Sequence, residues 1–135
     1  MHYSETTSDW RDLPNCARAD GHLFAIPDIH GQADLLERML VHVDRLPRPR
    51  PRTGVFLGDL IDRGPENLRS IDLALNAKTR FDKHVILPGN HEGMLIDGLD
   101  LPLESGAFHF WYEHGGHAVV HELLDGWVGT LDEMR

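Results

Sequence analysis

The feature that most constrains this fold is a repeated order in which a short apolar run is followed by a polar cluster. Residues 22–27 are mostly apolar and run into the loop 27–31, Pro-Asp-Ile-His-Gly. Residues 55–57 run into a loop that begins Gly58-Asp59, and residues 85–88 run into 89–92, Gly-Asn-His-Glu. Each run has the length and bounding residues of a buried strand. The sequence therefore predicts three strands, each ending in a tight polar loop.

Helical spacing follows each of these loops. Apolar residues recur at intervals of three and four after the first loop, which predicts a helix over about residues 32–43. The same spacing at Leu68, Ile71 and Leu75 predicts the inward stripe of a second helix, with Pro65 in its first turn. Residues 94–96 predict a short helix, residues 98–106 a loop and residues 119–124 a last helix.

Strands that alternate with helices predict an α/β fold, a layered and largely parallel sheet with flanking helices. A length of 135 residues is enough for one hydrophobic core, so we expect residues 1–135 to form a single domain. In open α/β sheets, ligands bind at the carboxyl ends of the strands. The three polar loops are therefore expected to converge on one site.

Composition excludes several classes of protein. Thirteen basic against 22 acidic residues give a net charge of −9, which disfavours binding to nucleic acid. The single cysteine, Cys16, cannot form an internal disulfide, and we assign it no role and expect a cytoplasmic protein. No signal sequence or membrane-span pattern is evident. The Pro/Arg run 45–52 predicts an extended, solvated connection between the first helix and the second strand.

Polar residues of the kinds that bind metal and phosphate gather on the predicted loop edge. They are Asp28, His30, Asp59, Asp62, Arg63, Asn90 and His91. Their oxygen and nitrogen ligands suit Mn²⁺, Fe or Zn²⁺ in an open catalytic site. A carboxylate such as Asp59 can bridge two cations about 4 Å apart, which together clamp a phosphoryl displacement. Arg63 adds a planar fork that matches phosphate oxygens.

Each loop alone has a simpler interpretation, since an Asp-x-His-Gly loop is common and Asn-His-Glu often only caps a helix. Together they resemble the motifs of the calcineurin-like metallophosphoesterases, specifically the serine/threonine phosphoprotein phosphatase branch. The matching segments are 27–31 (Pro-Asp-Ile-His-Gly), 58–64 (Gly-Asp-Leu-Ile-Asp-Arg-Gly) and 89–92 (Gly-Asn-His-Glu). The resemblance covers about residues 20–125 and implies the first half of the family's αββα sandwich.

The resemblance also implies a role for each matching residue. Asp28 and His30 would bind the first metal, Asp59 would bridge, and Asn90 would bind the second metal and the substrate phosphate. His91 would be the catalytic acid, with Asp62 orienting its imidazole. Arg63 would grip the phosphate. A metal-held hydroxide would be the nucleophile, because a metal ion lowers the pKa of its bound water to about 7.

The chain departs from the family pattern in two places. Pro27 stands where the family has glycine. The chain also stops before the region from which relatives supply two further histidines to the second metal and the second sheet of the sandwich. The second site is therefore expected to be incomplete, and an uncovered sheet to favour self-association. Four nearby histidines are expected to be structural or surface residues rather than replacement ligands: His109, His114, His117 and His121.

These observations favour a metal-dependent phosphoesterase that hydrolyses phosphoserine or phosphothreonine in a phosphorylated protein, with manganese as the expected metal. One alternative is a symmetrical dinucleoside tetraphosphate hydrolase, which shares the first two motifs approximately. Asp62, Arg63 and Glu92 favour the phosphatase branch. A second alternative is a truncated, inactive fragment that binds one metal or a partner. The presence of an acid, its orienting carboxylate and a phosphate clamp argues against that alternative.

Overall fold

A computed structural model describes residues 21–47 and 51–124. Three strands form one parallel sheet in the order β1 (His22–Ile26), β2 (Arg52–Phe56) and β3 (Lys83–Ile86). The register pairs Ile26 with Phe56 and Phe56 with Ile86. The three strands therefore end level with one another, and the polar loops leave from a single edge of the sheet.

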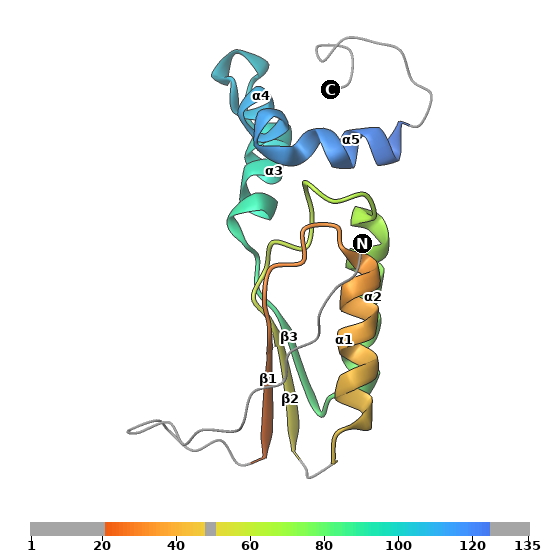
Figure 1. The fold of residues 1–135 in the computed structure, drawn as a ribbon. Coiled ribbons are helices and arrows are strands. Elements are labelled where there is room, and N and C mark those ends of the chain that lie inside the picture. Colours follow the sequence, from red (N-terminus) through yellow and green to blue (C-terminus); the bar gives the residue numbers. More distant parts are fainter. Residues whose placement is uncertain (1–20, 48–50, 125–135) are drawn as a thin grey trace.

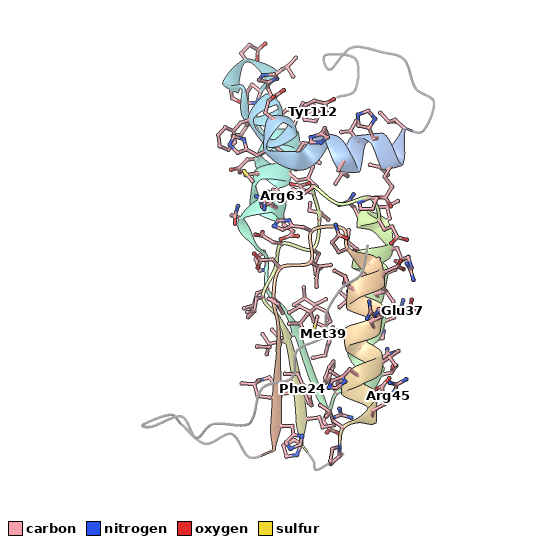
Figure 2. All side chains as sticks on the ribbon, viewed as in Figure 1. Phe24, Glu37, Met39, Arg45, Arg63 and Tyr112 are labelled. Atoms are coloured by element: carbon pink, nitrogen blue, oxygen red, sulfur yellow. The ribbon has the colours of Figure 1, made fainter. Side chains whose placement is uncertain are left out.

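Two helices cover one face of this sheet (Figure 1). They are α1 (Ala33–Arg45) and α2 (Asn67–Asn76), the crossover helices of two successive parallel connections. Because such connections are right-handed, a sheet that grows in one direction receives both helices on the same face. The hydrophobic core lies between these helices and the sheet, and it includes Ile26, Leu36, Leu40 and Phe56. Figure 2 shows Met39 of α1 directed toward this sheet. The predicted α/β fold with flanking helices is thus confirmed.

The second helix buries only part of the predicted apolar stripe. Leu68 and Leu75 are 45% and 53% exposed, while the buried residues are Asn67, Ser70 and Ala74. Ile71, the third residue of the predicted stripe, is partly buried against the core, as predicted. The fully buried positions are taken by small or polar side chains, and the Ser70 hydroxyl donates to the Glu66 carbonyl at 2.8 Å. The helix also begins later than predicted, since its N-cap is Glu66. Pro65 therefore precedes the first turn.

The rest of the described chain is helical. A 3₁₀ turn (Ala77–Arg80) leads into β3, and α3 (Asn90–Asp100) follows it. A second 3₁₀ turn (Leu103–Ser105), α4 (Ala107–Trp111), a π-type turn (Tyr112–Gly116) and α5 (His117–Leu123) complete it. The predicted last helix is confirmed, but α3 begins within the third motif and extends past residue 98, where a loop was expected. The Glu92 carboxylate accepts the Gly89 amide at 2.7 Å, and this N-terminal contact explains the early start.

Most of the described Pro/Arg segment is exposed, as predicted: Arg45, Pro47 and Pro51 are exposed, and residues 48–50 lie outside the described residues. Arg52 is the exception. Arg52 begins β2 and is only 4% exposed. Its guanidinium donates to the Val43 carbonyl at 2.7 Å and lies 5.0 Å from the centre of the Phe24 ring. A buried guanidinium held by a carbonyl and an aromatic face is a packing element rather than a solvated charge.

The other face of the sheet carries exposed apolar residues. Leu23, Leu57 and Leu87 are 60%, 46% and 44% exposed. Within residues 21–47 and 51–124, no helix or strand covers this face (Figure 1). Among the same residues, no helix is both long and apolar enough to cross a membrane.

We expect Gly54→Ala to destabilise the protein. A Cβ at Gly54 would lie 2.5 Å from the Phe81 ring, which is itself buried. Overpacking of this kind costs about 1–3 kcal/mol of unfolding free energy, measurable by urea denaturation. Gly93→Ala is the matched control, because a Cβ there meets no atom within 4 Å. Its helix should gain up to about 1 kcal/mol. Equal effects of the two substitutions would contradict this packing.

Candidate metal and phosphate site

Backbone hydrogen bonds join the first two loops at the carboxyl edge of the sheet. The amides of Ile29 and His30 both donate to the Asp59 carbonyl at 2.9 Å, and Gly31 donates to the Leu60 carbonyl at 2.9 Å. The loop after β1 is thereby fixed against the loop after β2. The side chains of His30 and Asp59 consequently meet above the sheet edge.

Four residues of these loops have a left-handed backbone although none of them is glycine. They are His30, Asp59, Asp62 and Arg63, with φ of 46°, 50°, 71° and 67°. Each such conformation costs on the order of 1 kcal/mol or more, and it persists only where surrounding contacts enforce it. All four belong to the predicted site, so the strain is concentrated where the loops turn their side chains toward one another.

Glu92 makes several of the contacts that hold these loops in their strained conformation. Its carboxylate accepts hydrogen bonds from the amides of Asp59 and Leu60 at 2.8 Å each and from Gly89 at 2.7 Å. One side chain of α3 thus ties the second loop to the third. In the sequence, Glu92 distinguished the family branches and belonged to a motif that often caps a helix. Its position three residues after an N-cap was the signal for this structural role.

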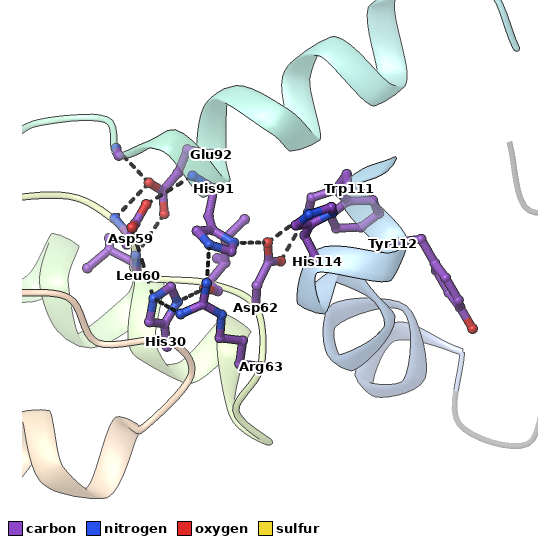
Figure 3. Close-up of polar contacts among 12 residues, drawn as sticks. His30, Asp59, Leu60, Asp62, Arg63, His91, Glu92, Trp111, Tyr112 and His114 are labelled. Carbon is purple, nitrogen blue, oxygen red and sulfur yellow. Dashed lines mark hydrogen bonds and ion pairs between the residues drawn. The ribbon is translucent and has the colours of Figure 1, made fainter. Parts of the chain in front are cut away.

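The histidine and aspartate side chains form a group that could hold a metal ion. Ligand atoms of His30, Asp59 and His91 all lie within 4.8 Å of one another (Figure 3). His30 Nδ1 donates to the Ile61 carbonyl at 2.9 Å, and His91 Nδ1 donates to Asp62 at 2.7 Å. Both imidazoles therefore turn Nε2 toward the group, as metal-ligating histidines with oriented rings do. Asp59 is oriented in turn, because its Oδ1 accepts the His91 amide at 2.9 Å.

The chemistry of this spot suits a cation. The Arg63 guanidinium lies against it, with Nη1 3.0 Å from His30 Nε2 and Nη2 2.9 Å from His91 Nε2. A guanidinium only donates hydrogen bonds, so both Nε2 atoms present lone pairs to the same place. Two imidazole lone pairs and one carboxylate are ligands that Mn²⁺, Fe or Zn²⁺ accept. His30 and Asp59, which the sequence predicted as ligands, therefore fit a metal ion here. His91, the third member of the group, is the residue that the sequence predicted as the catalytic acid.

Asp62 is fully buried behind His91. Its carboxylate accepts His91 Nδ1 on one side and the Trp111 indole N–H on the other (Figure 3). Burial raises the pKa of this carboxyl, and the hydrogen bonds from His91 and Trp111 oppose that shift. The carboxylate thus depends on these two donors for the stability of its charge.

The remaining predicted residues lie at the rim. Asp28 is exposed and lies outside the group formed by His30, Asp59 and His91. Asn90 is exposed at the first position of α3, and Arg63 is exposed at the mouth of the site. Exposed positions outside the group are also occupied by the four later histidines: His109, His114, His117 and His121.

The α4–α5 segment supports the site in ways that sequence reasoning missed. The Gly115 carbonyl accepts the Arg63 amide at 3.0 Å. The Glu122 carboxylate accepts the amides of Asn67 and Leu68 at 2.6 and 3.1 Å, which caps the start of α2 from another helix. A cap supplied from a distance of 55 residues leaves no local signal.

Comparisons with known proteins agree with this geometry. The family model described as "Calcineurin-like phosphoesterase" matches residues 21–132. The chain is 35% identical over 98 residues to "Serine/threonine-protein phosphatase 2" of Salmonella typhimurium, and 34% identical over 95 residues to the Escherichia coli protein of that name. It is 38% identical over 79 residues to "Serine/threonine-protein phosphatase 4 catalytic subunit" of Candida glabrata.

The matches cover 71%, 70% and 58% of this chain, respectively. They cover only 39%, 38% and 25% of the three relatives, so the chain spans less than half the length of each. The family match nevertheless extends over all three motif loops and over the α4–α5 segment that supports them. On the fold, the loop geometry and this match, the chain belongs to the calcineurin-like phosphoesterase family.

Proposed function

We propose that this chain is a metal-dependent phosphoesterase that hydrolyses phosphoserine and phosphothreonine monoesters. The observation that carries the proposal is that residues able to bind a metal ion lie beside a general acid and a guanidinium that can bind phosphate. His91 is a buried member of the group with His30 and Asp59, and its Nδ1 is hydrogen-bonded to Asp62. The Arg63 guanidinium lies against this group. The names of the relatives, serine/threonine-protein phosphatases, support a phosphorylated protein as the substrate class.

His30 and Asp59 are the residues that would hold metal, with Asp28 and Asn90 completing the set that the resemblance implies. We propose two divalent ions, with manganese as the metal. When bound, the metals supply Lewis acid activation of water and of the phosphoryl group. Asp59 suits a bridging position, because its Oδ1 is fixed by the His91 amide and its Oδ2 lies 4.0 Å from His30 Nε2.

The chain's own residues divide the remaining work. Arg63 offers two N–H groups in one plane, which suits bidentate binding of phosphate oxygens, and Asn90 adds an amide donor at the same rim. His91 holds one proton at Nδ1 for Asp62 and directs Nε2 into the site, from which a second proton can pass to the leaving oxygen. Asp62 stabilises the imidazolium form through the 2.7 Å contact.

The partner class and setting follow from the same chemistry. We propose a phosphorylated protein as partner, no role for nucleic acid, a cytoplasmic location and a single domain over residues 1–135. A net charge of −9 and a single cysteine support the second and third of these proposals.

Asp59→Asn should abolish metal-dependent hydrolysis of an aryl phosphate and of a phosphoserine peptide. The substitution removes the carboxylate that the His30 group needs for a cation, so we expect a loss of at least a hundredfold with Mn²⁺. Asp72→Asn, at an exposed position of α2, is the control and should keep full activity. A chelator should reduce the wild type to the Asp59→Asn rate.

Wild-type activity no higher than that of Asp59→Asn would overturn the phosphoesterase proposal. It would leave a chain that only binds metal or a partner. Faster cleavage of diadenosine tetraphosphate than of the phosphopeptide would instead overturn the proposed substrate class.

His91→Asn tests whether His91 acts as the general acid rather than as a metal ligand. Loss of a general acid typically lowers turnover by about 10²–10⁴-fold. Because His30 and Asp59 remain, we expect the variant to retain most of its bound metal in inductively coupled plasma mass spectrometry. Loss of metal in proportion to activity would show that His91 is a ligand instead.

Glu92→Gln should weaken metal binding without touching a proposed ligand. A glutamine amide can accept through one oxygen only, and its own N–H groups would face the donors now held by Glu92. We expect the unfolding free energy to fall by about 1–3 kcal/mol and the Mn²⁺ affinity to fall in calorimetric titration. Glu104→Gln, at an exposed position, is the matched control. Affinity equal to wild type would contradict the proposed role of Glu92 in holding the loop of Asp59.

A further inference from the structure

The buried carboxylate of Asp62 has a second donor that the proposed chemistry does not use. Trp111 Nε1 lies 2.9 Å from Asp62 Oδ2 and 3.1 Å from Oδ1, and the Trp111 side chain is only 2% exposed. Figure 3 shows the indole on the side of Asp62 opposite the His91 imidazole. Trp111, Asp62 and His91 thus form a continuous chain of hydrogen bonds that runs from α4 into the site.

The two donors share one acceptor atom. His91 Nδ1 and the indole N–H both bind Oδ2, at 2.7 and 2.9 Å. The indole also reaches Oδ1, so it opposes rotation of the carboxylate about its Cβ–Cγ bond. Among the described residues, these are the side-chain donors of this fully buried group. Without the indole, one oxygen would lose its partner inside the protein, and the carboxylate would be free to turn.

The segment around Trp111 is built so that the indole can reach Asp62. A Cβ at Gly116 would lie 2.3 Å from the Trp111 ring, so only glycine leaves room for the indole there. Gly115, at φ 122°, brings its carbonyl onto the Arg63 amide, and a Cβ there would lie 2.7 Å from the Arg63 side chain. The same turn therefore places the indole on Asp62 and holds the strained backbone of the next residue.

We propose that Trp111 is a positioning residue that acts on His91 through Asp62. The indole N–H fixes the carboxylate so that Asp62 keeps the proton of His91 on Nδ1 and turns Nε2 toward the leaving oxygen. In the step it supports, the oxygen of an attacking hydroxide forms a bond to phosphorus, and the phosphorus–oxygen bond to the alcohol breaks. The Nε2 proton of His91 moves to the departing alcohol oxygen. His91 is then neutral, with its Nδ1 proton still on Asp62. This inference rests on the proposed phosphoesterase function.

Leaving-group dependence tests the role in catalysis. Trp111→Phe keeps an aromatic ring and removes the N–H. An acid matters most for a poor leaving group, so we expect kcat for phenyl phosphate to fall at least tenfold at nearly constant KM. Hydrolysis of 2,4-dinitrophenyl phosphate, whose phenolate leaves without a proton, should fall less than threefold. Equal losses on the two substrates would overturn the proposal.

Phe108→Leu is the matched control for packing. Phe108 is buried in the same helix and meets Trp111 at a ring separation of 5.5 Å, but it has no polar atom to offer. This variant should change the two substrates by the same factor. If Phe108→Leu also slowed phenyl phosphate more than 2,4-dinitrophenyl phosphate, as expected for Trp111→Phe, the effect of Trp111 would be one of packing alone.

A double-mutant cycle tests whether Trp111 acts through Asp62. If it does, Trp111→Phe should add less than a twofold loss in an Asp62→Asn background. Multiplicative losses would mean that the two side chains act independently. A wild type no faster than Asp59→Asn would overturn the proposed function. That result differs from equal losses on the two substrates and from multiplicative losses in the cycle, which would overturn only the role of Trp111.

Nuclear magnetic resonance tests the positioning without any activity. In protein kept metal-free with chelator, Asp62→Asn should shift the indole N–H resonance of Trp111, and Trp111→Phe should shift the ring nitrogens of His91. Phe108→Leu should leave the His91 nitrogens near their wild-type positions. Unchanged His91 resonances in Trp111→Phe would overturn the inference even in an inactive chain.

Discussion

The loop from Gly58 to Gly64 is the part on which the rest of the site depends. It receives the amides of the first loop on the Asp59 and Leu60 carbonyls, and it gives its own amides to Glu92. Three of its residues have a left-handed backbone that few side chains adopt. A loop in such a conformation would relax if its partners were removed one by one. Its shape is therefore a property of the whole arrangement of strand ends and helices around it.

Those partners come from three separate parts of the described chain. The loop after β1 donates its backbone amides, and α3 contributes the Glu92 carboxylate. The α4–α5 segment contributes the Trp111 indole and the Gly115 carbonyl. Helices beyond the third strand thus act at the site although they add nothing to the sheet. A site held by rigid elements on several sides is organised before any ligand arrives, which is what electrostatic stabilisation of a reaction requires.

Sequence reasoning predicted the parts of this molecule that have local signals. The strand–loop–helix order predicted a parallel sheet, and the level strand ends brought His30, Asp59 and His91 together. Leu68 and Leu75 were wrongly placed inside, because spacing does not reveal a helix that packs through small residues such as Ser70 and Ala74. Arg52 was wrongly assigned to solvent with the rest of the Pro/Arg segment, because nothing local indicates that it lies against Phe24.

The sequence also could not predict the contacts that residues far apart in the chain make around the site. Trp111 lies 49 residues from Asp62 and Glu122 lies 55 residues from Asn67, so no spacing rule connects them. Glu92 carried a signal, but a local helix cap and a tie across two loops look the same in sequence. The ligand types could thus be predicted, whereas the contacts that hold them in place required the fold.

Charge at the sheet edge explains why such a site needs cations. Four carboxylates belong to the three loops and only one guanidinium accompanies them: Asp28, Asp59, Asp62 and Glu92 against Arg63. Glu92 is occupied by backbone amides and Asp62 by His91 and Trp111. Of the other two carboxylates, Asp59 places Oδ2 4.0 Å from His30 Nε2 and Asp28 is exposed at the rim. A phosphate ester carries a charge of about −1.5 to −2 near neutral pH and would be repelled from these two carboxylates. Divalent ions reverse that sign, and the lone pairs of His30 and His91 already favour a cation there. The acidity of this edge is thus an argument for metal in a site that must bind an anion.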